Sequence, residues 1–325
     1  MIKRLAAIVF AALGLFALAA QAAAQQYPAR TITIVVPYPA GGPTDTTARE
    51  IARGLSDRLK QNVIVENVTG GGTIIATNKV ARADPDGYTL LLHNLQISAN
   101  ATLYKNLPFD TEKDLTTVML VNKNPLVLLG RNTLKANDFK GLLALMKKQT
   151  LKAAIPGYGA TGHLATTLLA QETKTKIDEI PYRGSAPAMT DLMGGHVDLF
   201  IATPQAAVPQ VKAGKLKAYA VTSTEKLADL PTAAPLATVL GPKFDIIFWQ
   251  ALFAPAKTPD AVLKKLNATL QEVVADPALV KRWKVEGFDA FPKNQQSIDA
   301  GRAFLKSEIE RWGKVIRDNN IKVNQ

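Results

Sequence analysis

The chain has 325 residues, a length that suggests two lobes and is ample for a buried core. It contains no cysteine, which excludes disulfide bonds, thiolate metal sites and a lipid anchor attached through cysteine. The formal net charge of +12 is spread along the chain and not gathered in runs with interleaved aromatic residues, so we expect no nucleic-acid partner. The basic excess fits either a plain solvated surface or a field that draws in small anions.

The first 24 residues have the pattern of a secretory signal peptide. Lys3 and Arg4 precede an uncharged run, residues 5–24, that ends in alanines and offers an A-x-A cleavage site. The run is long enough to be marginal for a membrane span, but its alanine content and small-residue end favour cleavage near Ala24. We therefore expect export to the periplasm, where reduced nicotinamide cofactors are not normally available.

The mature chain alternates between expected strands and helices, which is the pattern of an α/β fold with largely parallel sheets. Its first unit is a β-branched strand over residues 31–36, a turn rich in proline and glycine, and a helix that Thr44 or Asp45 can cap. Further strands are expected over residues 62–66, 88–93, 151–156 and 177–182. Turns rich in glycine or proline adjoin these strands.

Two long apolar segments, residues 118–129 and 246–254, have no helical period and stand on either side of the middle of the chain. We interpret them as crossings between two lobes. Lobe 1 would then comprise residues 25–125 plus 250–325, and lobe 2 would comprise residues 126–249. A ligand cleft is expected between the lobes, at the carboxyl ends of their strands.

The segment from Gly157 to Gly162 fits the G-x-G-x-x-G pattern of dinucleotide-binding loops, and it stands between an expected strand and an expected helix. That fingerprint also needs an acidic residue at the far end of the next strand, where its carboxylate reaches a ribose. Asp178 and Glu179 stand at the near end instead, so we expect no nucleotide and no other cofactor. The glycines could simply permit a tight turn, or they could present backbone N–H groups to a small anion.

Three strand-to-helix turns have the same character: residues 41–42, 157–162 and 185–187. In a two-lobed protein all three can face one cleft, because ligands of open α/β sheets bind at the carboxyl ends of the strands. Together they would offer several unpaired N–H donors and aligned helix dipoles without any formal charge. A carboxylate suits such a site.

Several motifs follow one another in the order and spacing of a known protein family. They are VPYPAGGPTDTTAR (36–49), VENVTGGG (65–72), DPDGYTLL (84–91), PYRGSAPAMTDLMGGHVD (181–198), KAGKLKAYAVT (212–222) and FWQALFAPAKTP (248–259). Over essentially the whole mature chain, the sequence resembles the extracytoplasmic solute receptors of tripartite tricarboxylate transporters, also called the Bug or TctC-like family.

This resemblance implies a periplasmic-binding-protein fold, type II-like, with two α/β lobes. Each lobe would be a mostly parallel sheet flanked by helices, with the ligand cleft between the lobes. The resemblance also implies a small organic carboxylate as ligand, held largely by backbone amides and ordered water. The implied partners are the integral-membrane subunits of a transporter.

The resemblance places the family's first ligand-binding loop on residues 38–42 and its second on residues 157–161, with Ser185 and Thr203 in adjoining loops. The candidate ligand-binding residues are Tyr38, Pro39, Ala40, Gly41, Gly42, Gly72, Asn94, Gly157, Tyr158, Gly159, Ala160, Thr161, Ser185, Ala186 and Thr203. Asn94, like Gln96, could supply side-chain hydrogen bonds or belong to an exposed polar turn. Departures from the family pattern at residues 68–73 and 166–167 leave ligand size and polarity open.

The remaining candidates for chemistry are weaker. The three histidines, at positions 93, 163 and 196, are too scattered for a metal site of recognised spacing, so we expect no metal. Ser185, His163 and Asp191 could form a hydrolytic triad, but the chain has no G-x-S-x-G elbow. Ser185 is better interpreted as the N-cap of the following helix.

We therefore expect a monomeric periplasmic receptor, not an enzyme. It would close its two lobes around a small organic carboxylate and deliver it to a tripartite tricarboxylate-type membrane transporter. The alternatives are a secreted Ser/His hydrolase and a receptor whose ligand-loaded form signals to a sensor protein. The hydrolase would turn over an ester or amide, whereas a receptor would bind its ligand unchanged.

Overall fold

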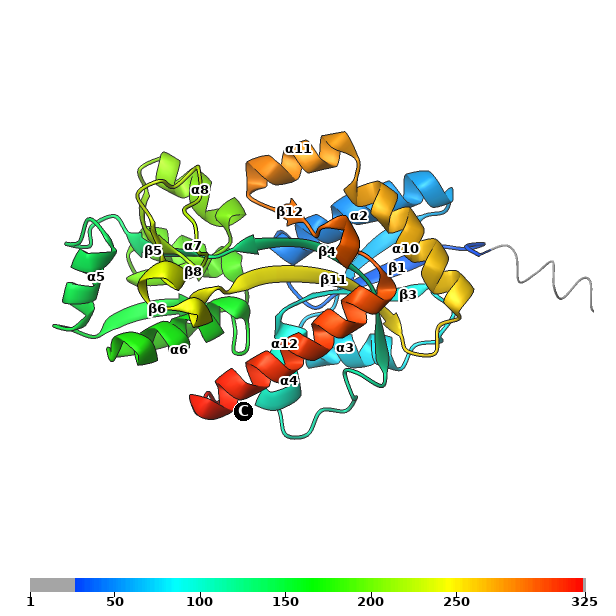
Figure 1. The fold of residues 1–325 in the computed structure, drawn as a ribbon, viewed down its shortest axis with the longest axis horizontal. Helices are drawn as coiled ribbons and strands as arrows, with labels where there is room; N and C mark the ends of the chain where they lie inside the picture. Colours follow the sequence, from blue (N-terminus) through cyan, green and yellow to red (C-terminus); the bar gives the residue numbers. More distant parts are fainter. Residues whose placement is uncertain (1–26, 324–325) are drawn as a thin grey trace, which may run out of the picture.

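The computed structural model describes residues 27–323, and the predicted signal peptide lies outside them. These residues form two lobes, each built on a six-stranded sheet (Figure 1). In spatial order the first sheet consists of β12 (Asp289–Ala290), β4 (Leu115–Pro125), β11 (Ile247–Pro255), β3 (Thr89–Asn94), β1 (Ile32–Val36) and β2 (Val63–Asn67). The second consists of β10 (Ala234–Pro235), β9 (Leu216–Val221), β5 (Val127–Arg131), β8 (Leu199–Ala202), β6 (Leu151–Ile155) and β7 (Ile177–Pro181).

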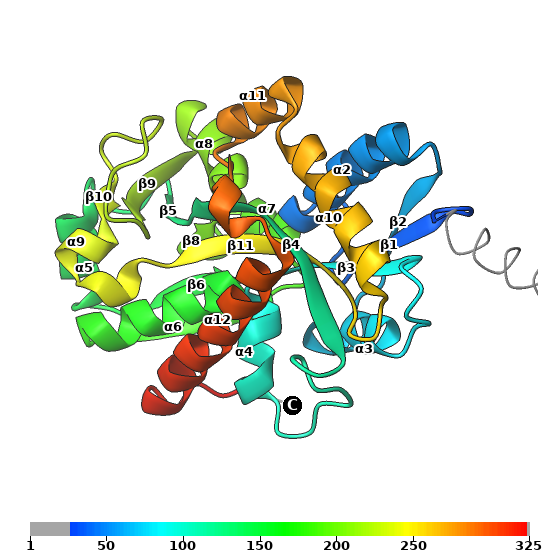
Figure 2. The ribbon, with the colours of Figure 1, turned by 45° about the vertical axis from the view of Figure 1, so that its right-hand side comes forward.

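Helices flank both sheets. They are α2 (Pro43–Leu59), α3 (Ile74–Ala81), α4 (Gln96–Leu103), α5 (Phe139–Met146), α6 (Thr161–Thr173), α7 (Ser185–Gly194), α8 (Pro204–Lys212), α9 (Leu236–Val239), α10 (Asp260–Val274), α11 (Pro277–Glu286) and α12 (Ile298–Asp318). Three short 3₁₀ turns are η1 (Gly71–Thr73), η2 (Pro242–Phe244) and η3 (Lys293–Gln295). Helix α10 packs beside α2, and α12 packs beside α4 and β4 (Figures 1 and 2). None of the helices in residues 27–323 is long and apolar enough to cross a bilayer.

The sequence predicts the strands well, and most strands of each sheet run in one direction, although both sheets are mixed. Strand β1 runs parallel to β2 and β3, whereas β11 runs antiparallel to β3 and β4. Likewise, β5 runs antiparallel to its neighbours β8 and β9. The reason is that β5 and β11 each enter their sheet from the other lobe, and not through a crossover helix from a strand of the same sheet.

The chain passes from one sheet to the other at two places, and the side chain of Thr222 is hydrogen-bonded to both. The first is Leu126, between β4 and β5, and the second is Ile246, just before β11. Thr222 is fully buried, and its hydroxyl accepts from the Leu126 N–H at 2.8 Å and donates to the Ile246 carbonyl at 2.6 Å. A lobe movement would bend the chain here. The lobe boundaries themselves stay a prediction, because they describe which residues move together.

The core of the first lobe is closed by aromatic residues whose polar atoms are paired. Trp249 on β11 and Trp312 on α12 both donate their indole N–H to the buried Glu308 carboxylate, at 2.7 and 3.1 Å. Trp283 on α11 donates to Glu50 at 2.7 Å. These bonds satisfy each buried indole N–H, and they fix α12 against the sheet and α11 against α2.

Candidate functional site

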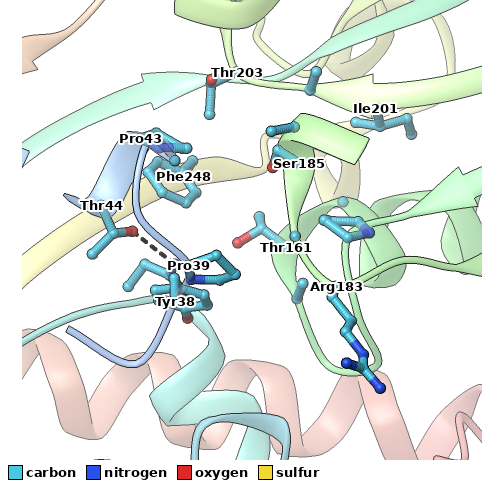
Figure 3. A pocket seen from close by; sticks show the side chains of 18 of the residues that line it. Tyr38, Pro39, Pro43, Thr44, Thr161, Arg183, Ser185, Ile201, Thr203 and Phe248 are labelled. Carbon is cyan, nitrogen blue, oxygen red and sulfur yellow. Dashed lines mark hydrogen bonds between the residues drawn. The ribbon is translucent and has the colours of Figure 1, made fainter. Parts of the chain in front are cut away.

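A cavity of about 70 Å³ lies between the lobes (Figure 3). Ten of the fifteen candidate ligand-binding residues line it: Tyr38, Pro39, Ala40, Gly42, Asn94, Ala160, Thr161, Ser185, Ala186 and Thr203. The other five, Gly41, Gly72, Gly157, Tyr158 and Gly159, are not part of the lining. The structure therefore brings the two predicted loops, the Ser185 turn and Thr203 to one place.

Eleven further residues line the cavity: Pro43, Thr44, Leu126, Pro156, Gly162, Arg183, Gly184, Pro187, Ile201, Ala202 and Phe248. Most of them extend the predicted loops by a residue or two. Ile201 and Phe248 are different, because they are apolar residues of strands β8 and β11. Apolar strand residues look like core residues in the sequence, so nothing in the sequence marks these two as part of a binding site. Only the geometry of the sheets places them beside the loops.

Three helices of the second lobe begin at the cavity without a side-chain cap. Their N-caps are Ala160 for α6, Gly184 for α7 and Thr203 for α8, and none makes a side-chain capping bond. Elsewhere α5, α11 and α12 are capped by Asp138, Asp276 and Ser297, whereas α2, α3, α4, α9 and α10 also lack a capping side chain. The first N–H groups of a helix have no intrahelical partner, and they carry a partial positive charge. The uncapped ends are therefore suited to an anion.

Ser185 is the first residue of α7 and not its N-cap, which corrects the sequence-based interpretation. The N-cap is Gly184, whose φ of 106° lies in a region that favours glycine over other residues. Ser185 thus stands one position further into the helix, half-buried and on the cavity wall.

The Thr161 hydroxyl has no hydrogen-bond partner, although it is buried. Thr161 begins α6 and is only 4% exposed, and its Oγ1 lacks any partner among the described residues. In Figure 3 this hydroxyl points into the space between the lobes. Leaving a buried hydroxyl unpaired costs about 1–3 kcal/mol. Such an atom indicates a place for a ligand oxygen or an ordered water.

Helix α2 differs from the other three because Asp45 fills the role of an anion at its start. The helix has Gly42 as N-cap and no capping side chain, so neither Thr44 nor Asp45 caps it as expected. Instead the Asp45 carboxylate accepts from the Gly41 N–H at 2.9 Å and from Arg49 and Asn67. Burial alone would raise the pKa of Asp45, but these hydrogen bonds outweigh it and hold the pKa below its ordinary value. Asp45 is thus ionised, and it fixes the loop before α2.

Comparison with known proteins decides the family. A family model described as "Tripartite tricarboxylate transporter family receptor" matches residues 47–321. The chain belongs to this receptor family. Protein BugT of Bordetella pertussis is 34% identical to it over 324 residues, which cover 98% of each chain.

Solved structures agree with this assignment. The periplasmic binding protein BugD is 35% identical, with a TM-score of 0.86 over 91% of this chain and 99% of its own. MatC from Rhodopseudomonas palustris, with bound malate, is 31% identical, with a TM-score of 0.83 over 89% of this chain and 100% of its own. The two-lobed α/β fold is confirmed. The family and these structural neighbours are solute-binding receptors, not enzymes.

Hydrogen bonds cross the receptor from one lobe to the other beside the cavity. The Tyr38 hydroxyl donates to Asn94 at 2.8 Å and to Gln96 at 3.1 Å, and Gln96 donates to the Tyr158 carbonyl of the opposite lobe at 2.9 Å. Burial raises the pKa of Tyr38, so its hydroxyl stays protonated. Asn94 and Gln96 are buried, which excludes an exposed turn. Tyr158 therefore joins the lobes through its backbone.

The receptor does not assemble the hydrolytic triad that the sequence allowed. His163 Nδ1 accepts from the Gly159 N–H at 3.0 Å, and its Nε2 lies 3.4 Å from a Glu179 oxygen. Asp191 accepts from the Tyr182 hydroxyl at 2.6 Å. In the described part of the chain no hydrogen bond joins Ser185, His163 and Asp191, so His163 supports the glycine loop. No group of acidic and histidine residues in that part could hold a metal ion.

Proposed function

We propose that this protein is a periplasmic receptor that closes its lobes around a small organic carboxylate. It then delivers the ligand to the integral-membrane subunits of a tripartite tricarboxylate-type transporter. The observation that carries this proposal is the unpaired, buried hydroxyl of Thr161 at an uncapped helix end, which faces a cavity between two lobes. The membrane partners rest on the description of the family.

Binding by helix ends suits a receptor that must also release its ligand. A carboxylate offers about four lone-pair sites, which can accept several backbone N–H groups and hydroxyls at once. These donors supply a positive potential without a charged side chain, so the emptied site leaves no buried unpaired charge. MatC, whose structure holds malate, supports a carboxylate as the ligand class.

The remaining parts of the proposal follow from the same site. The ten cavity-lining residues predicted from the sequence would contact the ligand, and the protein would act as a monomer. Lobe 1 (25–125 plus 250–325) and lobe 2 (126–249) would move as units about the connections at Leu126 and Ile246. No cofactor is needed, because the ligand leaves unchanged. The predicted signal peptide supports a periplasmic location.

A thermal-shift screen of the purified mature chain tests this function. Small mono- and dicarboxylates and their primary amides would be compared at equal concentration. A ligand present at 100 times its dissociation constant adds about 2.7 kcal/mol to the free energy of unfolding. We expect that at least one acid gives this stabilisation and that its amide does not.

Two results would contradict the proposal. Equal stabilisation by an acid and its amide would contradict a site that requires an anion. The absence of stabilisation by any acid would contradict the function as a carboxylate receptor. For the acid that binds, X-ray scattering should show a smaller radius of gyration at saturation, because the lobes close on the ligand.

A further inference from the structure

We infer that Gln96 is a positioning residue that couples the two ligand-binding loops, residues 38–42 of the first lobe and 157–161 of the second, and thereby slows the release of the ligand. This inference rests on the proposed function, and it adds the side chain that connects lobe closure to binding. Gln96 is not among the described residues that line the cavity. It would therefore act through the loops and not by contact with the ligand.

The Gln96 amide contacts one loop with each of its two ends. Its Oε1 accepts from the Tyr38 hydroxyl at 3.1 Å, although this hydroxyl donates at the shorter distance of 2.8 Å to Asn94. Its Nε2 donates to the Tyr158 carbonyl of the opposite lobe at 2.9 Å. An amide turned by half a rotation would place its oxygen against the carbonyl oxygen of Tyr158, where no hydrogen bond can form. The contacts on both sides thus agree on one orientation.

The first lobe holds Gln96 in place through bonds that do not involve the second lobe. Gln96 is the first residue of α4 and is only 3% exposed. Its backbone N–H donates to the Asn94 side-chain oxygen at 3.0 Å. One turn further along α4, Asn100 donates to the Gly72 carbonyl at 2.8 Å. The amide is therefore preorganised, so little side-chain entropy is lost when the second lobe reaches it.

The second lobe presents the Tyr158 carbonyl on a loop that is fixed in turn. The N–H of the next residue, Gly159, donates to His163 Nδ1 at 3.0 Å. Gly159 lies so close to α4 that a Cβ atom there would be 2.9 Å from Leu103 Cδ1 and 3.1 Å from Asn100 Oδ1. This close approach shields the bond to the Tyr158 carbonyl from bulk water, which strengthens it.

Two other glutamine amides also cross between the lobes, and the comparison distinguishes Gln96. Gln171 donates to the Asn319 carbonyl at 2.7 Å, and Gln205 donates to the Glu286 carboxylate at 2.9 Å. Gln171 is exposed and Gln205 is half-buried, so water can replace their partners when the lobes separate. Gln96 is buried, and it is bonded to a residue of each ligand-binding loop. Opening the lobes to release the ligand must break its bond to the second loop.

Surface plasmon resonance on the mature chain tests this inference through the rates of binding and release. The probe is the preferred acid, which is the member of the thermal-shift screen, with malate, adipate and benzoate included, that stabilises the parent most. Gln96→Met keeps nearly the same length and removes the amide. Its dissociation rate should be roughly 3- to 10-fold higher, the usual effect of one lost hydrogen bond. Its association rate should stay within about twofold of the parent, because the acid enters before the bond forms.

Gln296→Met is the matched control, because Gln296 is a buried glutamine whose amide donates to the Phe291 carbonyl of the same lobe at 2.7 Å. Both of its rates should equal those of the parent. Thermal unfolding without ligand shows whether the variants are folded. If Gln96→Met is not, Gln96→Asn takes its place, since it keeps an amide that is one methylene group too short to reach the Tyr158 carbonyl. The same rise in dissociation rate is expected.

Three results would overturn the inference and leave the receptor function standing. They are a folded Gln96 variant that releases the acid at the parental rate, one that loses affinity only through slower association, and a Gln296→Met protein that releases the acid as fast as the Gln96 variant. If the parent binds no acid of the screen, the proposed function fails, and the inference fails with it.

Discussion

Replacing Ser185 with aspartate should lower the affinity for the carboxylate ligand about a hundredfold while leaving the protein folded. A carboxylate introduced roughly 6 Å from that of the ligand, at an effective dielectric constant of about 20, costs on the order of 2–3 kcal/mol. The fold should tolerate it, because Ser185 is the first residue of α7 and acidic residues are favourable in the first turn of a helix.

Calorimetry on Ser185→Asp and on Ser185→Asn separates charge from size. The asparagine variant is nearly the same size as aspartate and uncharged, so it should keep most of the affinity. Thermal unfolding without ligand checks that both variants are folded. If folded Ser185→Asp binds a carboxylate as tightly as the parent, the end of α7 does not face the anion, and Ser185 is not part of the site.

Lowering the pH below 6.5 should destabilise the receptor through His93, by about 1 kcal/mol for each pH unit. Burial lowers the pKa of His93 from 6.5 to about 3. Its Nδ1 accepts the Asn94 N–H at 2.8 Å, and its Nε2 lies 3.1 Å from the Thr73 hydroxyl. In this range the unfolded chain binds a proton that the folded chain does not, so stability falls as the pH falls. Above pH 6.5 both states are neutral and the effect vanishes.

Urea denaturation of the parent and of His93→Gln at pH 6 and pH 5 measures this effect. Glutamine is polar but does not titrate, and the carboxylates that also respond to acid are common to both proteins. The parent should lose about 1 kcal/mol more than the variant over this interval, because the unfolded chain takes up a proton at His93 and the folded chain does not. Equal losses would mean that His93 is protonated in the folded protein as readily as in the unfolded chain.

Local sequence patterns were enough to find the strands but not the direction of every strand. The five predicted strands end within one residue of the observed ones, because β-branched or apolar runs are bounded by turn residues. The antiparallel course of β5 and β11 depends on where the chain crosses between lobes, which no local pattern encodes. Local patterns also do not identify Gly184 as the N-cap of α7, because the backbone conformation of Gly184 determines where the helix begins.

The candidate site was partly predictable for a similar reason. Its loops carry glycine, proline and hydroxyl residues between a strand and a helix, so their composition identifies them. Phe248 and Ile201 lie on strands and look like ordinary core residues in the sequence. The bond from the Gly41 N–H to Asp45 was also missed, because a carboxylate in a first helical turn gives no sign that it turns back to the preceding loop.

Thr161→Val tests most directly the central claim that the ligand carboxylate binds at the uncapped helix ends of the second lobe. Valine has nearly the shape of threonine and carries a methyl group in place of the hydroxyl, which has no partner in the described residues. Removing it should therefore leave the unliganded protein at least as stable as the parent. Ligand binding should lose a hydrogen bond to a charged group, about 1.5–3 kcal/mol or roughly 10- to 150-fold in affinity.

Thr166→Val is the matched control, because Thr166 is a buried residue of the same helix that does not line the cavity. Its hydroxyl donates to the Gly162 carbonyl at 2.7 Å. Calorimetry with the preferred acid should show the affinity loss in Thr161→Val and an affinity close to that of the parent in Thr166→Val. A folded Thr161→Val protein that binds the acid as tightly as the parent would contradict the claim.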